Sequence, residues 1–382
     1  MIEYRFIEPL DVLYLRGNKL FDGAGAHGAA LMPPWPSLAA GALRSRMLAD
    51  GGVDVAGFAR GEPISDARLA EVLGTPAKPG SFRIAAFTLA QRINGVIEPC
   101  FPLPADVVVT SQDLEAARYL QPTAINPVLR SSTPLPQLPL LRAAKPGKPI
   151  GGLWLNGEGW RAYMNGEPLA KDHLLRSSKL WQTDPRLGIA LKGSLGTAQT
   201  GMLYTAETVA LCENTGFLAG IQGADGALPA HGLLRFGGDG RGATITACAA
   251  ELPEPDWQRI ESEKRFRLIL ATPGIFEQGW RLPGLESDNS WHGPDDCSAR
   301  LVAACVNRAD TVSGWDLAKW QPKPAQRAAP TGSVYWFDEF QGSTEALDKL
   351  ATEGFWSLSS YPDLSRQAEG FNNVFIASWP RK

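Results

Sequence analysis

Residues 9–49, PLDVLYLRGNKLFDGAGAHGAALMPPWPSLAAGALRSRMLA, place a glycine-rich loop and a proline block between a strand and a helix. Upstream, Ile2, Tyr4 and Phe6 occupy alternate positions, which is the period of a half-buried strand. Downstream, Ser37 is the expected N-cap of a helix that carries an apolar stripe. The stretch is therefore predicted to be the first strand-to-helix crossover of the fold.

The glycines of this loop, in GAGAHG at residues 23–28, satisfy the GxGxxG pattern of dinucleotide-binding proteins. In those proteins the glycines lie directly between strand and helix, so that the pyrophosphate meets the helix N-terminus. Here the strand ends well before the glycines and MPPWP precedes the helix, which argues against a dinucleotide fold. Two interpretations remain: a loop without a ligand, or a loop whose N–H groups approach phosphates with help from Arg16, Lys19 and the helix start at Ser37.

Residues 81–98, which follow this crossover, continue the pattern of a supersecondary unit. Residues 81–91 and 93–98 are strand-like and flank Asn94-Gly95, a dipeptide favoured in tight hairpin turns. Strand, helix, strand, strand is the order that opens a ferredoxin-like unit. Prolines then recur up to Pro149, which predicts an irregular insertion over about residues 99–185.

Regular strand patterns resume after the insertion, and a second strand-rich half begins near Gly216. Residues 186–191 and 201–212 are strand-like and enclose a hairpin tip at residues 192–200. We predict an α+β fold with an N-terminal module at residues 1–213, which contains the insertion, and a C-terminal module at residues 214–382. No residue-level repeat relates the two halves, so their similarity is inferred from element order alone.

The composition is typical of a globular protein with two domains and many loops. The 382 residues include 40 Gly and 30 Pro spread along the chain, which favours a β-rich or α+β fold over a helix bundle. The net charge of −3 excludes an indiscriminate nucleic-acid binder, so such binding must use a local surface. The five cysteines include no CxxC pair, as is typical of reduced thiols. Because a signal-peptide pattern and a membrane-length apolar run are lacking, we expect a cytoplasmic protein with no membrane partner.

Two further segments carry loop chemistry that suits RNA. Residues 236–242, FGGDGRG, lie between strand-like runs, where a hairpin turn alone would explain the glycines. Arg241 would nevertheless lie on an exposed, backbone-rich tip, which suits a phosphate or a base edge. Residues 319–327 combine Lys323 and Arg327 with an aromatic ring, as in a groove for single strands, and are also compatible with a solvated loop.

Signals for catalysis are sparse. The four histidines show no HxH or HExxH spacing, and neither GxSxG nor GxxxxGK[ST] occurs. His292 with residues 295–297 could form a metal cluster, but in a Gly/Pro-rich loop these residues are typical of a polar turn. His27 is the one histidine placed where a general acid or base would be needed. We therefore expect no metal, no cofactor and no catalytic residue.

Taken together and in order, these segments resemble a known family. The chain is similar to the third subunit of the Cmr complex, the type III-B CRISPR effector, within the RAMP-superfamily group that caps the 5′ end of the guide RNA. The similarity extends from residue 9 to about residue 337. The matching pieces are PLDVLYLRGNKLF with PPWPSLAAGALRSRML, PCFPLPADVVV, RLGIALKGSLGTAQTGMLYTAETVAL, LLRFGGDGRGATI, ATPGIFEQGW and GWDLAKWQPKPAQRAAPTGSVYW.

The resemblance implies two ferredoxin-like, RNA-recognition-type modules with large Pro/Gly-rich insertions and no catalytic centre. It implies a subunit that holds the 5′ tag of the crRNA, binds the large cyclase/polymerase-like subunit and starts the backbone of RAMP subunits, meeting target RNA only indirectly. The RNA-binding residues implied are Arg16, Lys19, His27, Ser37 and Arg44 in the first motif, Lys192 at the hairpin tip, and Gly237, Gly238, Gly240 and Arg241 in the second glycine loop. Lys323 and Arg327 of the third basic stretch complete the predicted set.

Two alternative functions remain open. An endoribonuclease of the same superfamily would mature crRNA without a metal, with His27 as general acid or base. A protein–protein adaptor would place no glycine loop on RNA. The chain departs from the family pattern before its last strand, where RQAEGFNNVFIA contains only Gly370 in place of a glycine-rich loop, so an RNA contact there has the least support.

Overall fold

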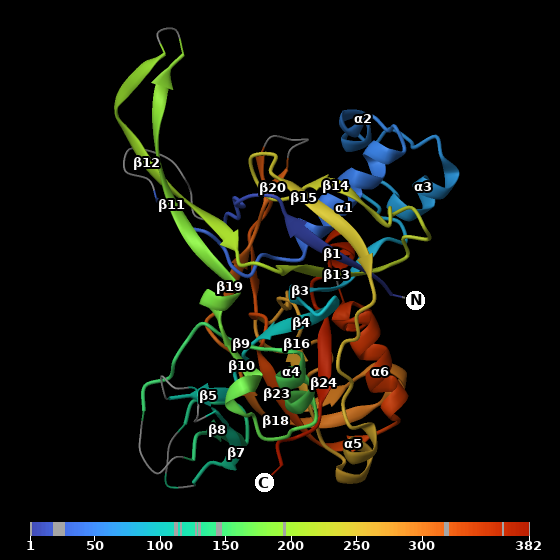
Figure 1. Cartoon of the computed structure of the whole chain (residues 1–382). Helices are drawn as coiled ribbons and strands as arrows, with labels where there is room; N and C mark the ends of the chain where they lie inside the picture. Colours follow the sequence, from blue (N-terminus) through green and yellow to red (C-terminus); the bar gives the residue numbers. More distant parts are fainter. Residues whose placement is uncertain are drawn as a thin grey trace.

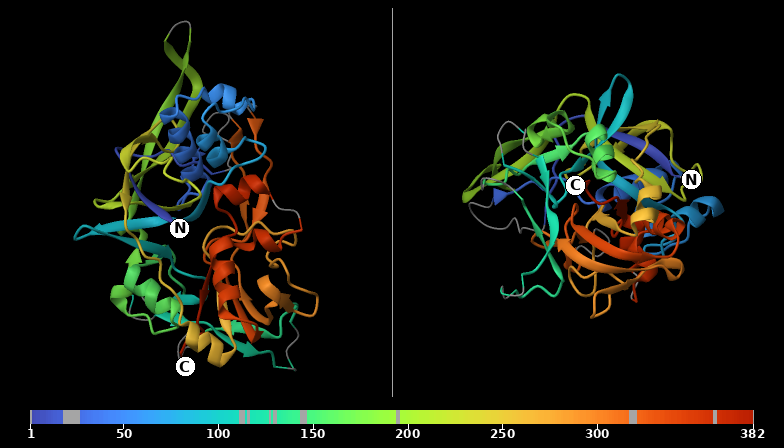
Figure 2. Two further views of the ribbon diagram at one scale, coloured as in Figure 1. Left: turned by 90° about the vertical axis from the view of Figure 1, so that its right-hand side faces the viewer. Right: turned by 90° about the horizontal axis from the view of Figure 1, so that it is seen from below.

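Two antiparallel sheets and a projecting hairpin organise the chain (Figure 1). The computed structural model describes residues 2–17, 27–110, 114, 117–126, 128, 131–142, 147–193, 196–316, 321–360 and 363–381, with the backbone alone at residues 27, 200 and 201. The side view in Figure 2 shows the N-terminal helices, in blue, above the C-terminal helices, in red, with the hairpin extending upward beyond both.

The first sheet has eight strands in the order β10-β9-β4-β3-β13-β1-β15-β14, and every neighbouring pair is antiparallel. The strands are β1 (Glu3–Pro9), β3 (Arg83–Ile93), β4 (Val96–Pro102), β9 (Leu153–Leu155), β10 (Leu174–Arg176), β13 (Thr215–Gln222), β14 (His231–Arg235) and β15 (Gly242–Cys248). The N-terminal strand β1 therefore lies between two strands from much later in the chain.

Three helices pack on this sheet: α1 (Ser37–Asp50), α2 (Val55–Ala59) and α3 (Ala67–Leu73). α1 buries Ala39, Leu43 and Met47, which are spaced four residues apart and so share one helix face, in the core of the first sheet. Asp54 and Asp66 cap α2 and α3 by accepting hydrogen bonds from backbone N–H groups of the first turn.

The second sheet has the order β17-β18-β23-β16-β24 and is also antiparallel throughout. Its strands are β16 (Phe266–Leu270), β17 (Ser290–His292), β18 (Ser298–Cys305), β23 (Val334–Gln341) and β24 (Val374–Ala377), accompanied by α5 (Trp257–Glu263), α6 (Thr344–Glu353) and α7 (Leu364–Glu369). Its core contains Phe266 and Phe337, stacked with ring centroids 4.8 Å apart, and Leu347 and Leu350 from α6. The second half thus has an apolar core of its own.

Small elements fill the connections. The insertion contains two-stranded sheets β5 (Val107–Val109) with β6 (Ala117–Tyr119) and β7 (Gln121–Ala124) with β8 (Gln137–Leu140), followed by α4 (Gly157–Met164). Between β18 and β23, β19 (Asp310–Val312) pairs with β22 (Gln326–Ala328), and β20 (Trp315–Asp316) pairs with β21 (Gln321–Pro322). Short 3-10 turns occupy Lys171–His173, Ser177–Lys179, Pro294–Asp296 and Phe355–Leu358.

A buried ion pair ties the insertion to the second sheet. Arg267 on β16 lies 2.5 Å from Asp106, and both side chains are 0% exposed. Arg267 also donates to the backbone carbonyls of Tyr163 at 2.7 Å and Ser378 at 2.9 Å, while the Tyr163 hydroxyl donates to Asp106 at 2.8 Å. Because the loss of either ion would leave the other buried without compensation, this network fixes the insertion against the sheet.

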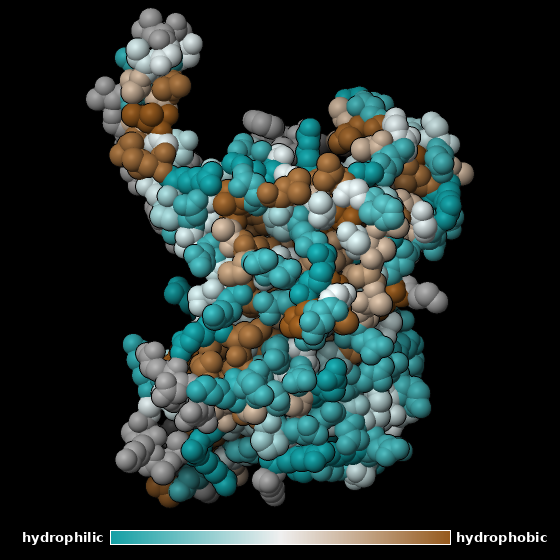
Figure 3. All heavy atoms as spheres, viewed as in Figure 1, coloured by the Kyte–Doolittle hydropathy of each residue, from teal (hydrophilic) through white to brown (hydrophobic). Residues whose placement is uncertain are grey.

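The projecting hairpin consists of β11 (Trp181–Lys192) and β12 (Thr197–Leu211), and β2 (His27–Gly28) adds to β12 in parallel. Leu187 and Ile189 share one face of β11, and Leu203 lies opposite Ile189 on β12. Their side chains are 69%, 44% and 47% exposed, and Figure 3 shows apolar residues along the arm. The hairpin extends away from the rest of the chain with an apolar face in solvent.

The α+β class is confirmed, and several local predictions hold. Asn94 and Gly95, with φ of 50° and 83°, join β3 to β4 in the expected hairpin. The predicted boundary after residue 213 differs from the division between the sheets, because β13, β14 and β15 belong to the first sheet. β13 is buried along almost its whole length and pairs on both sides, so the first sheet extends to Cys248.

Candidate nucleic-acid interface

The first loop, the second glycine loop and the base of the projecting hairpin meet at one place, although they are far apart in sequence. The Gly238 N–H donates to the Tyr14 carbonyl at 2.8 Å. Leu13 and Val209 exchange two backbone hydrogen bonds, each 2.8 Å long. We call this region, made of residues 11–16, 205–209 and 236–242, the junction.

The glycine loop at the junction is a turn between β14 and β15. Gly237 has a φ of 83°, a left-handed conformation that glycine adopts without strain. Phe236, which is fully buried, anchors the start of the turn, and its N–H donates to the Arg241 carbonyl at 2.8 Å. The hairpin interpretation of this glycine cluster is therefore confirmed, and Gly240 lies near its tip with a φ of 62°.

Arg241 is held inside the junction, which corrects the expectation of an exposed tip. Its Nη1 donates to the Asp11 carboxylate at 2.7 Å, and its guanidinium lies over the Tyr14 ring at 5.2 Å. The side chain is 24% exposed, and its Nε is buried without a hydrogen-bond acceptor among the described residues. The sequence did not signal this pairing because Asp11 and Arg241 lie in different halves of the predicted chain.

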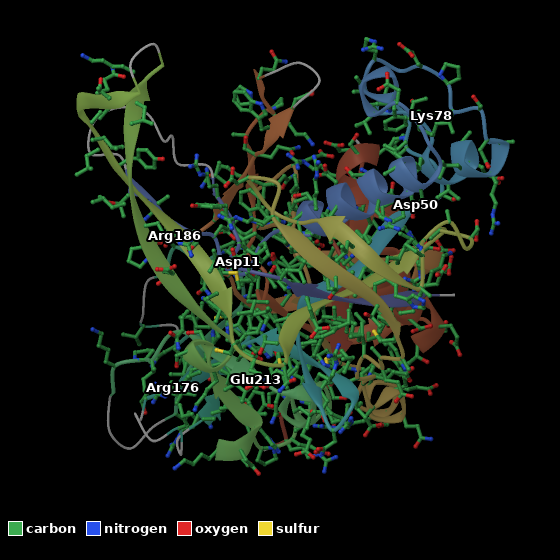
Figure 4. The ribbon with its side chains drawn as sticks, turned by 45° about the horizontal axis from the view of Figure 1, so that its top comes forward. Asp11, Asp50, Lys78, Arg176, Arg186 and Glu213 are labelled. Carbon is green, nitrogen blue, oxygen red and sulfur yellow. The ribbon has the colours of Figure 1, made fainter. Side chains whose placement is uncertain are left out.

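Other charged groups surround this pair. Arg16 is exposed, and its backbone bridges to Ala30. Arg186 lies at the base of the hairpin, on the same side as Asp11 in Figure 4. A hydrogen bond from Arg186 to Asp184, together with the nearby Tyr14 and Asp11, raises the pKa of Arg186. The junction therefore contains the guanidinium groups of Arg16 and Arg241 and the carboxylates of Asp11, Glu207 and Asp239, and Arg186 adjoins it.

For two predicted residues of the first loop, Lys19 and His27, the structure describes no side chain. Lys19 lies outside the described residues. The backbone of His27, in β2, pairs with that of Thr205, in β12. The His27 side chain is not among those described. On the returning strand, the Ala30 N–H donates to the Glu207 carboxylate at 3.0 Å. The loop thus begins and ends at the junction.

Ser37 does not cap α1 as predicted. The N-cap is Pro36, and no side chain accepts a hydrogen bond from the first turn. A proline has φ fixed near the helical value and so can begin a helix, but it offers no side-chain acceptor. Ser37 is instead the first residue of the helix, and no acidic residue occupies the first turn.

Arg44 and Lys323 lie together, away from the junction, around the Glu369 carboxylate of α7. Lys323 Nζ is 3.1 Å from this carboxylate and Arg366 is 2.8 Å from it. Arg44 lies over the Phe82 ring at 5.4 Å, and burial lowers the pKa of Arg44 while Glu369 opposes that change. A single carboxylate, Glu369, therefore lies near three cations, so this group keeps a net positive charge, and Arg44 Nη2 is buried without a hydrogen-bond partner among the described residues.

The remaining predicted residues are dispersed. Lys192 is exposed at the end of β11, at the far tip of the hairpin (Figure 1). Arg327 is exposed on β22, opposite Thr311. Gly370 ends α7, and a Cβ there would lie 2.7 Å from the Ile84 carbonyl oxygen. Close packing of α7 on β3 therefore requires this glycine, whatever its relation to RNA.

A cleft between the two halves was not predicted. It has a volume of about 240 Å³, opens beside the proline block of residues 31–36, and has Asp310 in its lining. Its walls come from β3, β4, β13 and residues 271–273 and 330–331. No sequence pattern marks the cleft, because its walls come from both halves of the chain.

The described residues contain neither a cluster of metal-binding side chains nor a membrane-spanning helix. Within the described residues, no group of three or more His, Cys, Asp or Glu side chains is placed to hold a metal ion. None of the helices in the described part of the chain has the length and apolar character to cross a membrane. The expected absence of catalysis remains a prediction.

Two antiparallel sheets, with a projecting hairpin whose base meets the glycine turn of the first sheet, define the chain as an α+β protein that brings three loops together. The sequence model of the family described as CRISPR-associated protein (Cas_Cmr3) matches residues 5–379. The chain belongs to this family, which confirms the resemblance noted from its motifs.

Solved structures share this fold. One, "Cryo-EM structure of the Type III-B Cmr-beta bound to cognate target RNA and AMPPnP, state 1", has a chain that is 14% identical, with a TM-score of 0.52 over 97% of this chain and 95% of that one. A second, "Cryo-EM structure of the Type III-B Cmr-beta bound to cognate target RNA", gives 14% identity, a TM-score of 0.49 and coverage of 97% and 96%. No curated protein matches the chain.

Proposed function

We propose that the chain is a non-catalytic crRNA-binding subunit of a type III-B CRISPR effector, and that it holds the 5′ tag of the crRNA. In this role it bridges the large cyclase/polymerase-like subunit to the backbone of RAMP subunits in the cytoplasm. Family membership supports the proposal, as does a fold shared with a chain of a Cmr-beta complex bound to cognate target RNA.

We infer that both sheets are built on ferredoxin-like modules. The strands β15-β1-β13-β3 follow the order 4-1-3-2 of such a module, with α1 to α3 between its first and second strands. The strands β24-β16-β23-β18 follow the same order, with α6 and α7 between the third and fourth. The first module then has its large insertion between its second and third strands.

The observation that carries the RNA proposal is the meeting of three separate loops at the junction. The hydrogen bonds Gly238 to Tyr14 and Leu13 to Val209 align backbone from three segments beside Arg16 and Arg241. Phosphate oxygens accept hydrogen bonds from backbone N–H groups and arginine, and such contacts position a strand of RNA. A local surface of this kind is also compatible with the net charge of −3, because a protein that binds one RNA does not need a positive net charge.

The exposed apolar face of the hairpin supports the proposed protein partners. Leu187, Ile189 and Leu203 leave apolar area in solvent that a neighbouring subunit would cover (Figure 3). A hairpin without a core of its own gains order from such a contact. This surface is separate from the backbone of the glycine turn, so one chain has surfaces for both RNA and protein.

The test uses the full chain assembled with its complex and a crRNA. Arg16→Ala combined with Arg241→Ala removes both cations of the junction, and the dependence of log affinity on log salt should flatten by roughly 1.4 for two lost contacts to single-stranded RNA. Arg60→Ala is the control, because Arg60 is exposed and paired with Glu62 at 2.7 Å on a different surface. Unchanged affinity and slope in the double variant would remove the junction from the RNA path.

The same preparation tests the catalytic alternative. Incubation with repeat RNA at neutral pH should leave the RNA intact if the subunit only binds. Metal-independent cleavage that disappears in His27→Ala would identify an endoribonuclease instead.

A further inference from the structure

The cleft beside the proline block lies at the seam between the two halves. Residues 31–36, β3 and β4 supply one wall, and residues 271–273, 330–331 and Asp310 supply the other. Seams of this kind are preferred places for small-molecule sites. The cleft also adjoins the start of α1, where Pro36 provides no side-chain acceptor for the first turn.

Asp310 is the one charged residue in the lining of this cleft. No described residue donates a hydrogen bond to its carboxylate or forms an ion pair with it. Burial alone raises the pKa of the Asp310 carboxyl above its ordinary value. Burying part of a carboxylate without a hydrogen-bond donor costs free energy in the unbound protein. A ligand that supplies N–H donors would reduce this cost.

The rest of the lining suits a flat ring. It is mainly apolar and includes the aromatic side chains of Trp35 and Phe87, which are partly exposed, and of Phe101, Trp154 and Phe217, which are buried. The volume of about 240 Å³ lies below the roughly 300–1,000 Å³ typical of pockets for drug-sized ligands. Unstacked bases of single-stranded RNA are bound in such places, against aromatic rings and with their edges hydrogen-bonded.

The Asp310 carboxylate would discriminate between the four bases by the hydrogen-bond donors that each base presents. Its two oxygens can accept two parallel hydrogen bonds. Guanine presents two adjacent donors, N1–H and the N2 amino group, on one edge. In uracil the single ring N–H lies between two carbonyl oxygens that repel a carboxylate, and in adenine and cytosine the amino group adjoins an acceptor nitrogen.

We propose that this cleft binds one unstacked guanine base of the RNA, with the Asp310 carboxylate accepting from guanine N1–H and N2–H. The inference rests on the proposed RNA-binding function and adds base recognition to the phosphate contacts of the junction. The Thr331 hydroxyl also lines the cleft and is a possible donor to guanine O6.

The experiment measures binding of the full chain to short alternating single-stranded oligonucleotides, r(UG), r(UI) and r(UA), at several salt concentrations. Inosine retains N1–H and lacks the N2 amino group, so it removes one of the two donors. The wild-type chain should bind r(UG) about tenfold more tightly than r(UI) or r(UA), the size expected for one well-formed base contact. Asp310→Asn should remove this preference without changing the salt slope, since no phosphate contact is lost.

Asp172→Asn is the matched control, because Asp172 is exposed in a 3-10 turn and is not part of the cleft lining, and it should retain the preference. Equal affinity for the three oligonucleotides in the wild-type chain, or a preference that survives Asp310→Asn, would overturn the guanine site while leaving salt-dependent RNA binding intact. Dissociation of a protein subunit from Asp310→Asn complexes, with base preference unchanged, would show that a protein group occupies the cleft. Failure of every oligonucleotide to bind would overturn the RNA function itself.

Discussion

The Asp11 carboxylate lies 2.7 Å from the Arg241 guanidinium and joins the first loop to the glycine turn. If the junction binds RNA as proposed, a phosphate oxygen would replace this internal anion beside Arg241. Asp11 is 59% exposed, so the pair is open to exchange with a ligand. The Asp11–Arg241 pair therefore stabilises the junction, and a ligand that displaces Asp11 would bind the Arg241 guanidinium.

Replacing Asp11 should strengthen RNA binding. Asp11→Asn releases Arg241 from its nearer carboxylate, 2.7 Å away, and leaves Asp239 at 3.8 Å, so the crRNA tag should bind more tightly and the salt slope should steepen by up to roughly 0.7, the value for one added contact to a single strand. Filter binding at several salt concentrations measures both quantities. Glu62→Gln removes an equally charged partner from the 2.7 Å pair with Arg60 and should leave the slope unchanged. A weaker complex in Asp11→Asn would mean that Asp11 itself contacts the RNA or holds Tyr14 in place.

Breaking the buried ion pair should destabilise the chain strongly. Asp106→Ala leaves Arg267 charged in a fully buried position, and the expected loss in the free energy of unfolding is about 3–5 kcal/mol. Urea unfolding measures this change. Lys349→Ala breaks the exposed pair with Asp295, 2.8 Å apart, and should cost at most about 1 kcal/mol. Equal effects of the two variants would contradict the anchoring role of the network.

Asp310 should reduce stability at neutral pH. Burial raises the pKa of its carboxyl in the folded chain, so the ionised form opposes folding and this penalty is lost as the pH falls through the folded pKa. Asp310→Asn should therefore raise the melting temperature at pH 7, and the gain should fade below about pH 3.9, the ordinary value for Asp. Calorimetry across this range gives the result, with Asp172→Asn expected to show no gain at either pH. A lower melting temperature in Asp310→Asn at pH 7 would indicate that the carboxylate has a stabilising partner.

Ser37 and Asn156 should respond differently to alanine. Ser37 is the first residue of α1 and makes no capping bond, so Ser37→Ala should change the free energy of unfolding by less than about 0.5 kcal/mol. Asn156 caps α4 by accepting from the Gly159 N–H at 2.8 Å, so Asn156→Ala should cost about 1 kcal/mol. Denaturant midpoints compare the two variants directly. A cost at Ser37 as large as that at Asn156 would restore Ser37 as a capping residue.

Local patterns predicted much of the fold. Alternation at Tyr4 and Phe6 predicted β1, and Asn94-Gly95 predicted the β3–β4 hairpin, because period and turn chemistry depend on neighbouring residues alone. The turn at residues 236–242 was predicted for the same reason. Ser37 was misplaced by one position because a capping serine and a serine after a helix-starting proline look alike in sequence.

The site was predictable only in its parts. The loops of the junction were each identified, but the Asp11–Arg241 pair depends on the β1–β15 register, which brings Pro9 opposite Ala243. Arg44 was expected on the tag path because the family resemblance implied it, whereas in the structure its side chain is largely buried on the helix that packs against α7. The Asp310 cleft requires both halves to be folded and packed, and no local pattern encodes such a site.

The central position of β1 also governs the order of events during synthesis. Its partners β13 and β15 end at Gln222 and Cys248, so β1 leaves the ribosome well before the two strands that pair with it. At roughly 5–20 residues per second, translation takes about 12–48 s to pass from the end of β1 to the end of β15. During that interval Tyr4, Phe6 and Ile7 have no sheet to join, and the nascent chain depends on chaperones or on its own early helices to keep this apolar strand from associating elsewhere.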